Sequence, residues 1–570
     1  MVLNTNKSKI NQQKSISEEF SKLRVFKWGL QQIHRFTKSL YENSEEGERV
    51  KAYPIKELNR FLEICKQSPV KAYQAEKDKN DKILVEALLD HPVYQLRQAL
   101  VAVYISNIMA KPVGVIIRQD DPKKRKLFTN LGVREVIDFY EIVPKVSALK
   151  YLYSAYSLLN SATSKDQIVK TSINNINIGR SIYSSYLRST GRATINKKDS
   201  NLFHKTLSSY TYVQEVGRFV DEKNYSDVII GTNIYSPYFE IGESFISNGG
   251  VVWSVSGRSS HTTVRRYEGE TLAQSPFNIR KSDLNDIGKK KLKSLASVGK
   301  KEIEKRVKNK VEFKDRTTVK KAFGEEKDIV TEDAIRRQFG WSKKKPIVCV
   351  MSHALTDAVH KERSMLYTDY YTWLKDTANK AEEVEAAYWL FKAHPNESNY
   401  NTERGAREIV NNVCSSERVA ICPDYVNTAS LLEFISVVIT VRGTAGLEFS
   451  CYGIPAVLAG ESIYSGLGFT QEPSSVSEYR EVLANISSLS SLSESQIQRA
   501  RAAAGIRFGY FGVQSSILPV APPSFDFDWS DFWISAAENI EDKDPEKDPL
   551  YVGLREQIRT DDTHLKNPEM

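Results

Sequence analysis

Apolar runs of strand length alternate with amphipathic segments of helix length along the first half of the chain. Strand–helix–strand order with connections of a few residues implies a parallel sheet with right-handed crossovers. The strands that this pattern predicts lie at 82–89, 112–118, 134–140, 227–230 and 249–255, and the helices near 94–110, 121–131 and 235–247.

The same alternation restarts after residue 330, following a stretch rich in lysine. Ligands of such sheets bind outside the carboxyl ends of the strands, so two sets of strand ends that face one another would form a cleft. We therefore predict an α/β fold of two Rossmann-like domains facing a central cleft. The second set of strands is expected at 346–351, 386–392, 418–422, 437–441 and 454–458, with a short helix at 430–434.

The pattern divides the chain into five parts. Residues 1–75 are expected to form a helical N-terminal extension, and 76–275 the first Rossmann-like domain. Residues 276–329 read as a basic helical connector, and 330–515 as the second Rossmann-like domain. Residues 516–570 form a C-terminal segment whose tail after Glu538 is polar, so we expect this tail to be mobile.

Composition supports a folded, multidomain protein. With 570 residues, of which 41% are hydrophobic, the chain is too long for one ordinary core and too apolar for wholesale disorder. No apolar run is long enough to predict a membrane-spanning helix, and the start lacks the apolar core of a signal peptide. The 5 cysteines are scattered and never spaced CxxC, which fits a reducing cytosol better than a zinc site or a disulfide framework.

The net charge of +9 comes from a single stretch of the chain. Residues 280–321 contain 16 Lys or Arg and 6 Asp or Glu, which accounts for the whole excess. A solvated connecting face is one interpretation, and a patch for anionic lipid, glycan or nucleic acid is another. Stacking aromatics are sparse there, so we do not expect nucleic-acid binding. Residues 15–41 carry one apolar stripe among basic residues, which either packs on the next domain or lies on an anionic membrane surface.

The segment after the predicted strand 437–441 carries the richest chemistry. Arg442 supplies a cation, and Gly443, Thr444 and Gly446 form a small-residue turn that a phosphate could approach before a helix. Glu448, in the first helical turn, could accept hydrogen bonds from a ribose diol. The alternative is a plain strand–helix junction with glycines for packing and a capping glutamate.

Two further candidates follow apolar strands of the second domain. His394 lies at the carboxyl end of 386–392, where an imidazole could hold a phosphate or protonate a leaving group. A structural loop histidine is the alternative. Ser352 follows the strand 346–351 and is a candidate ligand contact at the same edge.

The order and spacing of these segments resemble the capsule polysaccharide biosynthesis family of glycosyltransferases. This family includes bacterial transferases that add Kdo from a CMP-linked donor, and the resemblance covers about 345–515. The segments that carry it are His394-Pro395, Asp424 to Glu433, Gly443 to Glu448, Gly453 to Val457 and Tyr464 to Thr470.

The resemblance implies a GT-B-like fold and a metal-independent glycosyltransferase that acts in surface or capsular polysaccharide biosynthesis. It implies a nucleotide-sugar donor on the second domain, with His394 near its phosphate and Tyr464 among the donor-binding residues, and no cofactor. The acceptor would be an oligosaccharide or a lipid-linked glycan. We expect a cytoplasmic protein, peripheral at the inner face of the plasma membrane. In the first domain, Arg180 stands where a similar family segment has Asp after Gly.

An inverting transfer also needs a base for the acceptor hydroxyl, supplied from the opposite domain. Asp90 and His91, just after the first strand, have the right position, with Glu240 and Glu243 as rivals and ordinary capping roles as the alternative. Two other functions stay open. One is a CDP-polyol (teichoic-type) phosphotransferase, and the other is a non-catalytic glycan-binding protein of the same fold.

Overall fold

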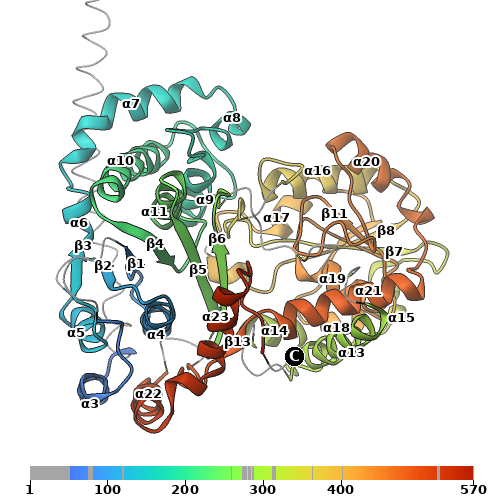
Figure 1. Ribbon diagram of the computed structural model, residues 1–570. Coiled ribbons are helices and arrows are strands. Elements are labelled where there is room, and N and C mark those ends of the chain that lie inside the picture. The colour runs from blue at the N-terminus through green and yellow to red at the C-terminus, as the bar shows by residue number, and fades with distance from the viewer. Residues whose placement is uncertain are drawn as a thin grey trace, which may run out of the picture.

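The computed structural model describes residues 52–74, 81–118, 121–258, 260–272, 279, 284, 288–310, 316–361, 364–400, 402–522 and 527–568. The membrane prediction for residues 15–41 lies outside the described residues. Two sheets built mainly from parallel strands organise the chain, each in its own lobe (Figure 1), which confirms the α/β fold with two Rossmann-like domains. Within the described ranges, no helix combines the length and the apolar character needed to cross a membrane.

The first sheet has the order β13-β6-β5-β4-β1-β2-β3. Its strands from β5 to β3 are parallel, and β6 and β13 form an antiparallel edge. In the register, Ile83 pairs with Val113 on one side and with Asp227 on the other. The strands are β1 (Lys82–Glu86), β2 (Val113–Ile117), β3 (Glu135–Asp138), β4 (Tyr225–Ile230), β5 (Val251–Arg258), β6 (His261–Tyr267) and β13 (Val513–Gln514).

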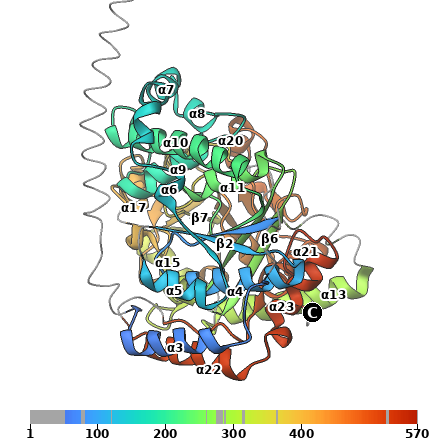
Figure 2. The same ribbon diagram turned by 60° about the vertical axis from the view of Figure 1, so that its left-hand side comes forward.

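Helices cover both faces of the first sheet, as βα units with right-handed crossovers require. Figure 2 shows α9, α10 and α11 on one face and α4 and α5 on the other. The helix pattern found in the sequence missed the long helical stretch between β3 and β4. The helices of this half are α3 (Ile55–Gln67), α4 (Pro92–Met109), α5 (Pro122–Asn130), α6 (Phe139–Ile142), α7 (Ser147–Ser161), α8 (Lys165–Val169), α9 (Gly179–Thr190), α10 (Ser200–Glu222) and α11 (Tyr238–Ser247).

The second sheet has the order β12-β11-β10-β7-β8-β9 and is parallel throughout. Its strands are β7 (Ile347–Met351), β8 (Tyr388–Lys392), β9 (Val419–Ile421), β10 (Val437–Thr440), β11 (Ala456–Leu458) and β12 (Thr470–Gln471). Its helices are α15 (Glu332–Phe339), α16 (Tyr370–Glu383), α17 (Ala406–Asn411), α18 (Thr428–Leu431), α19 (Thr444–Ser450), α20 (Val476–Ala484) and α21 (Glu494–Gly505).

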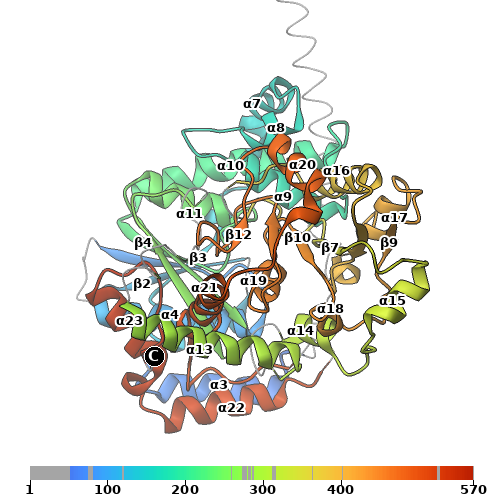
Figure 3. The same ribbon diagram turned by 90° about the vertical axis from the view of Figure 1, so that its right-hand side faces the viewer.

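The basic connector forms α13 (Gly288–Val307) and α14 (Arg316–Phe323), and α13 packs along α21 of the second lobe (Figure 3). Two glycines allow this close approach. A Cβ on Gly299 would lie 1.8 Å from the Arg501 carbonyl oxygen, and one on Gly505 would lie 2.2 Å from that of Leu295. The connector is therefore built into the second lobe rather than being a solvated link.

After α21 the chain returns to the first lobe. β13 joins the first sheet, and α22 (Ser530–Asp542) and α23 (Pro549–Arg559) pack beside α3 and α4. The Trp533 indole donates to the Ala52 carbonyl (2.9 Å), and the Tyr104 hydroxyl donates to buried Asp548 (2.9 Å). The prediction of a mobile polar tail is wrong for these residues. They form two helices with apolar inner faces, and the charged residues either cap these helices or face outward.

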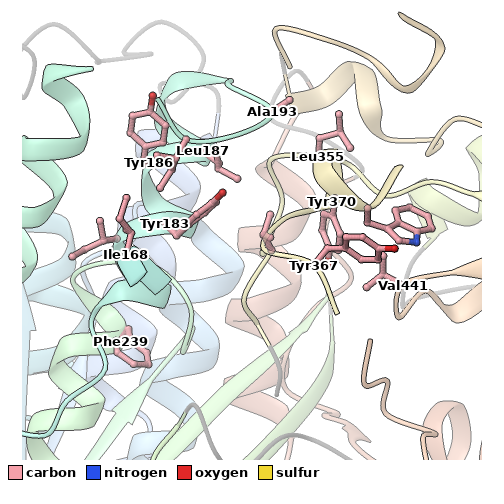
Figure 4. Close-up of a cluster of buried hydrophobic side chains, with 14 of the residues drawn as sticks. Ile168, Tyr183, Tyr186, Leu187, Ala193, Phe239, Leu355, Tyr367, Tyr370 and Val441 are labelled. Carbon is pink, nitrogen blue, oxygen red and sulfur yellow. The ribbon is translucent and has the colours of Figure 1, made fainter. Parts of the chain in front are cut away.

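A shared hydrophobic cluster joins the two lobes (Figure 4). Figure 4 shows Tyr183 and Leu187 of α9 on one side and Leu355 and Tyr370 of the second lobe on the other. Polar bonds fix the same interface, since the Tyr183 hydroxyl donates to Asp369 (2.5 Å). The two sets of strand ends are thus held in one arrangement.

Candidate functional site

Three neighbouring strands of the second sheet, β8, β7 and β10, end at one pocket of about 120 Å³, which we call the strand-end pocket. Parallel neighbours present their carboxyl ends at the same edge, so residues that are far apart in sequence meet there. Its polar lining residues are Arg306, Ser352, His353, Lys392, His394, Thr428, Thr440, Thr444 and Glu448.

His394 follows β8 and presents an imidazole to this pocket. The Asn396 backbone N–H donates to its Nδ1 (3.2 Å), so the ring proton of the neutral form lies on Nε2. Burial lowers the pKa of His394 to about 4; Asp357 acts to raise it, and Lys321 lowers it further. At neutral pH, His394 is therefore an uncharged hydrogen-bond donor whose proton affinity an incoming anion would raise.

His353, which follows β7, is the second imidazole at the edge. The Arg442 backbone N–H donates to its Nε2 (3.3 Å), and its ring stacks on Tyr370 with the centroids 4.3 Å apart. Burial lowers the pKa of His353 well below its ordinary value, and the nearby His394 and Arg442 lower it further. The locked orientation of His353 follows only from these tertiary contacts.

Two hydroxyls in the pocket lack a partner within the part of the chain that the structure describes. Ser352 Oγ and Thr428 Oγ1 are both buried without a hydrogen bond. A buried hydroxyl left without a partner costs about 1–3 kcal/mol, which a bound ligand can relieve. Ser352 was predicted from its place after β7. Thr428, at the start of α18, lies in the segment Asp424 to Glu433 that carries the family resemblance, but it was not predicted as a site residue.

The turn before α19 is shaped by its glycines and by Tyr464. Gly443 and Thr444 line the pocket, as the sequence predicts. Tyr464 instead lies behind the turn, where its hydroxyl donates to the Gly443 carbonyl (2.5 Å), and a Cβ on Gly446 would come within 2.2 Å of that hydroxyl. In the structure, Gly446 and Tyr464 therefore hold the turn in place, and neither lines the pocket.

Glu448 lines the pocket and is bonded to the connector. The Arg306 Nε of α13 donates to Glu448 Oε1 (2.9 Å), and both side chains are less than a tenth exposed. Arg306 also lies over the Phe508 ring, 4.5 Å from its centroid. Arg306 was not predicted, because it is one of 16 basic residues in residues 280–321, and the pattern of that stretch singles out none of them.

A second, larger hollow of about 570 Å³ adjoins the strand-end pocket, and we call it the outer hollow. The two share Lys392, His394 and the apolar residues beside them. Lys321 and Lys327 from the connector and Arg407 from α17 add positive charge to its lining, against Glu326, Glu397 and Asp424. Together, the two spaces have the size and mixed lining of a small-molecule site.

Arg442 does not line either space. Its Nη2 donates to the Val359 carbonyl (3.2 Å), and the guanidinium faces the lobe interface, 6.0 Å from the centre of the Tyr370 ring. There it meets Arg180 of α9: burial lowers the pKa of Arg180, and Arg442 lowers it further, whereas Glu461 raises it. Arg442 was predicted as a donor ligand, and its backbone rather than its side chain reaches the pocket edge.

The structure does not bring Asp90 and His91 to this pocket. Asp90 accepts hydrogen bonds from Tyr53 (2.9 Å) and Gln95 (3.1 Å), and the His91 ring packs edge-on against Trp529 of the C-terminal segment. Burial lowers the pKa of His91 to about 4. Their assignment as a catalytic base stays a prediction without geometric support.

The rivals Glu240 and Glu243 are also enclosed within the first lobe. Glu240 accepts from Ser181 (2.9 Å) and from Ser209, and Glu243 accepts from the Leu272 backbone (2.6 Å). Both side chains are at most 2% exposed, so neither reaches a substrate in this arrangement. Among the described residues, no group of three or more His, Cys, Asp or Glu side chains is arranged to hold a metal ion.

Residues 265–507 match the family model described as "Capsule polysaccharide biosynthesis protein". No curated protein matches the chain at a significant level. Among solved structures, the chain is similar to two structures of Thermosulfurimonas dismutans KpsC. The beta Kdo 2,4 transferase has 13% identity and a TM-score of 0.32, covering 49% of this chain and 79% of that one. The beta Kdo 2,7 transferase has 16% identity and a TM-score of 0.30, covering 51% and 80%.

Anabaena HepE in complex with UDP and glucose is similar over 74% of this chain and 93% of its own, with 13% identity and a TM-score of 0.22. At such scores the likeness carries no argument, so the fold rests on the two sheets themselves. The matched residues 265–507 run from β6 through the connector to the end of the second sheet, and they include every residue of the strand-end pocket. The resemblance to the capsule polysaccharide biosynthesis family is therefore confirmed for this part of the chain.

Proposed function

We propose that the protein is a glycosyltransferase of surface or capsular polysaccharide biosynthesis, which takes a sugar from a nucleotide-activated donor bound at the strand-end pocket. One observation carries the proposal. His394 presents a neutral imidazole N–H to a buried pocket in which two hydroxyls, of Ser352 and Thr428, lack partners among the described residues. That set of donors suits a phosphate.

In this proposal, the phosphate of the donor lies against His394 Nε2. A phosphate oxygen accepts the imidazole hydrogen bond, and its charge raises the proton affinity of His394 from the low value of the empty pocket. Lys392 and Lys321 stand beside His394 and offset the charge that develops on the leaving phosphate. The charge can therefore be stabilised by residues of this chain.

The ribose lies towards Glu448. With Oε1 engaged by Arg306, Oε2 is left to accept hydrogen bonds from a diol. The apolar wall that Val319, Ala322 and Phe323 of α14 form over the pocket offers a surface for a base. The outer hollow then takes the sugar, and a CMP-linked sugar is the donor form that the family resemblance favours.

The transfer itself is a substitution at the anomeric carbon. The acceptor hydroxyl oxygen forms the new bond to that carbon, the carbon–oxygen bond to the phosphate breaks, and the nucleotide leaves with the electron pair. The hydroxyl proton passes to a base or to the departing phosphate. We place an oligosaccharide or lipid-linked glycan acceptor on the first lobe and the protein in the cytoplasm, which fits its free cysteines, all but one of them buried.

Thermal unfolding in the presence of CMP, CDP, UDP, GDP or ADP, without added metal, tests the donor site. A nucleotide at about 100 times its Kd adds about 2.7 kcal/mol to the free energy of unfolding, so binding raises Tm visibly. We expect a rise with CMP that His394→Ala and Glu448→Ala remove. Glu448→Gln, which keeps an acceptor for Arg306, separates loss of the ribose contact from loss of folding.

The other outcomes are informative. A rise with CDP alone, followed by transfer of a polyol phosphate, would replace the proposal by a polyol phosphotransferase. Binding without turnover of any nucleotide sugar would make the protein a glycan-binding member of the fold. No rise with any nucleotide would overturn the donor site.

A further inference from the structure

Helix α7 lies at the outer end of the first lobe, with α10 beneath it (Figures 1 and 3). Its inner face is buried, because Leu152 and Ala155 pack against Phe203 and Leu207 of α10. The Tyr151 hydroxyl donates to Glu215 of α10 (3.0 Å) and fixes the rotation of the helix. The orientation of its outer face is therefore determined by these contacts.

The outer face of α7 carries several large apolar side chains beside the polar Ser157 and Asn160, where a surface helix is ordinarily polar. Val146, Leu149, Tyr153 and Tyr156 are 68%, 37%, 53% and 38% exposed. At about 100° per residue, these four side chains fall within a sector of about 80° on the side away from α10. We call them the α7 stripe. The other large apolar side chains that are exposed on the described residues are scattered singly or in pairs.

Positive charge flanks the α7 stripe. Residues 142–165 contain three lysines and no Asp or Glu, and Lys145 and Lys150 lie on opposite sides of the stripe. At the end of the helix, a hollow of about 200 Å³ is lined by Tyr156, Lys197 and Lys198, and also by Asp199, whose carboxylate is paired with Arg192. Apolar side chains beside a basic rim fit an acidic, amphipathic surface.

We propose that the α7 stripe lies on an anionic phospholipid surface, with the hollow beside Tyr156 taking a lipid headgroup phosphate. Tyrosine suits this place because its ring is apolar and its hydroxyl stays at the polar boundary. The lysines attract acidic headgroups electrostatically. The connector helix α13 carries more charge, but no large apolar side chain is exposed on its described part.

This inference does not depend on the proposed donor site. It concerns the first lobe alone, and it assigns that lobe a membrane-facing side. It is also distinct from the prediction for residues 15–41, because the α7 stripe would bind whether or not those residues reach a membrane.

Sedimentation of the full chain with lipid vesicles tests the proposal. We expect the protein to pellet with vesicles of phosphatidylcholine containing one part in three of phosphatidylglycerol, but not with phosphatidylcholine alone, and binding to weaken as salt rises. Leu149→Asp with Tyr153→Asp should weaken binding tenfold or more, and Lys145→Glu with Lys150→Glu should do the same. The matched control is Ile329→Asp with Val520→Asp, two exposed apolar residues elsewhere, which should change nothing.

A local probe makes the test specific to α7. An environment-sensitive dye on Tyr153→Cys should report transfer to an apolar medium when vesicles are added, whereas the same dye on Ile329→Cys should stay in water. A dye on residue 153 that stays in water while the protein pellets would overturn the proposal, since another surface would then bind. A fall in Tm or a change of oligomeric state in the Leu149/Tyr153 variant would also overturn it, because the stripe would then be covered by this chain or by a second copy.

Discussion

The carboxyl edges of the two sheets differ although both follow the same strand–helix pattern. In the second sheet, the residues after β7, β8 and β10 open on a pocket that contains His394 and the Ser352 hydroxyl, which has no partner in the described part of the chain. In the first sheet, Glu86 at the end of β1 is fully buried and accepts from Tyr94, the Leu88 backbone and the Gly231 backbone.

The difference shows that a strand end is a candidate site only where neighbouring side chains leave its polar groups without partners. At the first edge, protein groups already donate hydrogen bonds to Glu86. At the second edge, Ser352 Oγ and Thr428 Oγ1 have no partner among the described residues, and a ligand could supply one.

His394→Ala should lower glycosyl transfer by about 100-fold or more, because a hydrogen bond and a proton donor to the leaving phosphate are lost. His91→Ala, its counterpart at the first edge, should leave nucleotide affinity unchanged and lower only the free energy of unfolding. Steady-state kinetics with the nucleotide sugar that raises Tm, together with denaturant unfolding, measure both. Equal losses of activity in the two variants would show that the first edge takes part in the reaction.

Glu86→Ala should cost about 3 kcal/mol of unfolding free energy, because the Tyr94 hydroxyl and two backbone N–H groups lose their acceptor inside the first lobe. Ser352→Ala should change the free energy of unfolding by less than about 0.5 kcal/mol, since it removes a hydroxyl without a protein partner among the described residues. It should instead weaken nucleotide binding about tenfold, or about 1.4 kcal/mol. Urea unfolding and calorimetric titration separate the two effects.

His91 and His394 should contribute equally to the pH dependence of stability, but only His394 should contribute to the pH dependence of nucleotide binding. Both have a folded pKa lowered to about 4 against about 6.5 when unfolded, so the unfolded chain binds more protons between these values. Stability is thus complete above pH 6.5 and falls as pH drops towards 4. Each of His91→Asn and His394→Asn should remove about 1.4 kcal/mol per pH unit of this slope.

Of the two histidines, only His394 should make nucleotide affinity depend on pH. A bound phosphate raises the pKa of His394, so nucleotide affinity should increase as pH falls. Calorimetric titration from pH 7 to pH 5 should show this increase in His91→Asn and not in His394→Asn. Because protonation of the nucleotide itself affects both variants equally, it drops out of the comparison between them. An increase that survives in His394→Asn would place the phosphate elsewhere.

Tyr464→Phe should have the smallest effect. It removes the hydrogen bond to the Gly443 carbonyl behind the turn, which contributes about 1 kcal/mol to unfolding free energy. Because the turn then loses its support, nucleotide affinity should fall only a few-fold, while transfer continues. A loss as large as that of His394→Ala would show that Tyr464 contacts the donor directly.

Ten strands of the two sheets, but not β6, β12 and β13, and the residues at the carboxyl edge of the second sheet followed from the sequence alone. Apolar runs of five or six residues that alternate with helical segments indicate buried parallel strands, and a residue that follows such a strand lies at the carboxyl edge of its sheet. His394, Ser352, Gly443, Thr444 and Glu448 were found in this way, and all of them line the strand-end pocket.

Only the tertiary structure showed which carboxyl edge borders a pocket and which distant residues complete its lining. Arg306 reaches Glu448 from 142 positions away, and Trp529 of the C-terminal segment covers His91. Local patterns specify strand and helix, but they contain no information on which distant segment packs over a given residue. The direction of a side chain, as for Tyr464 and Arg442, is set by that packing, and so is the exposure of the α7 stripe.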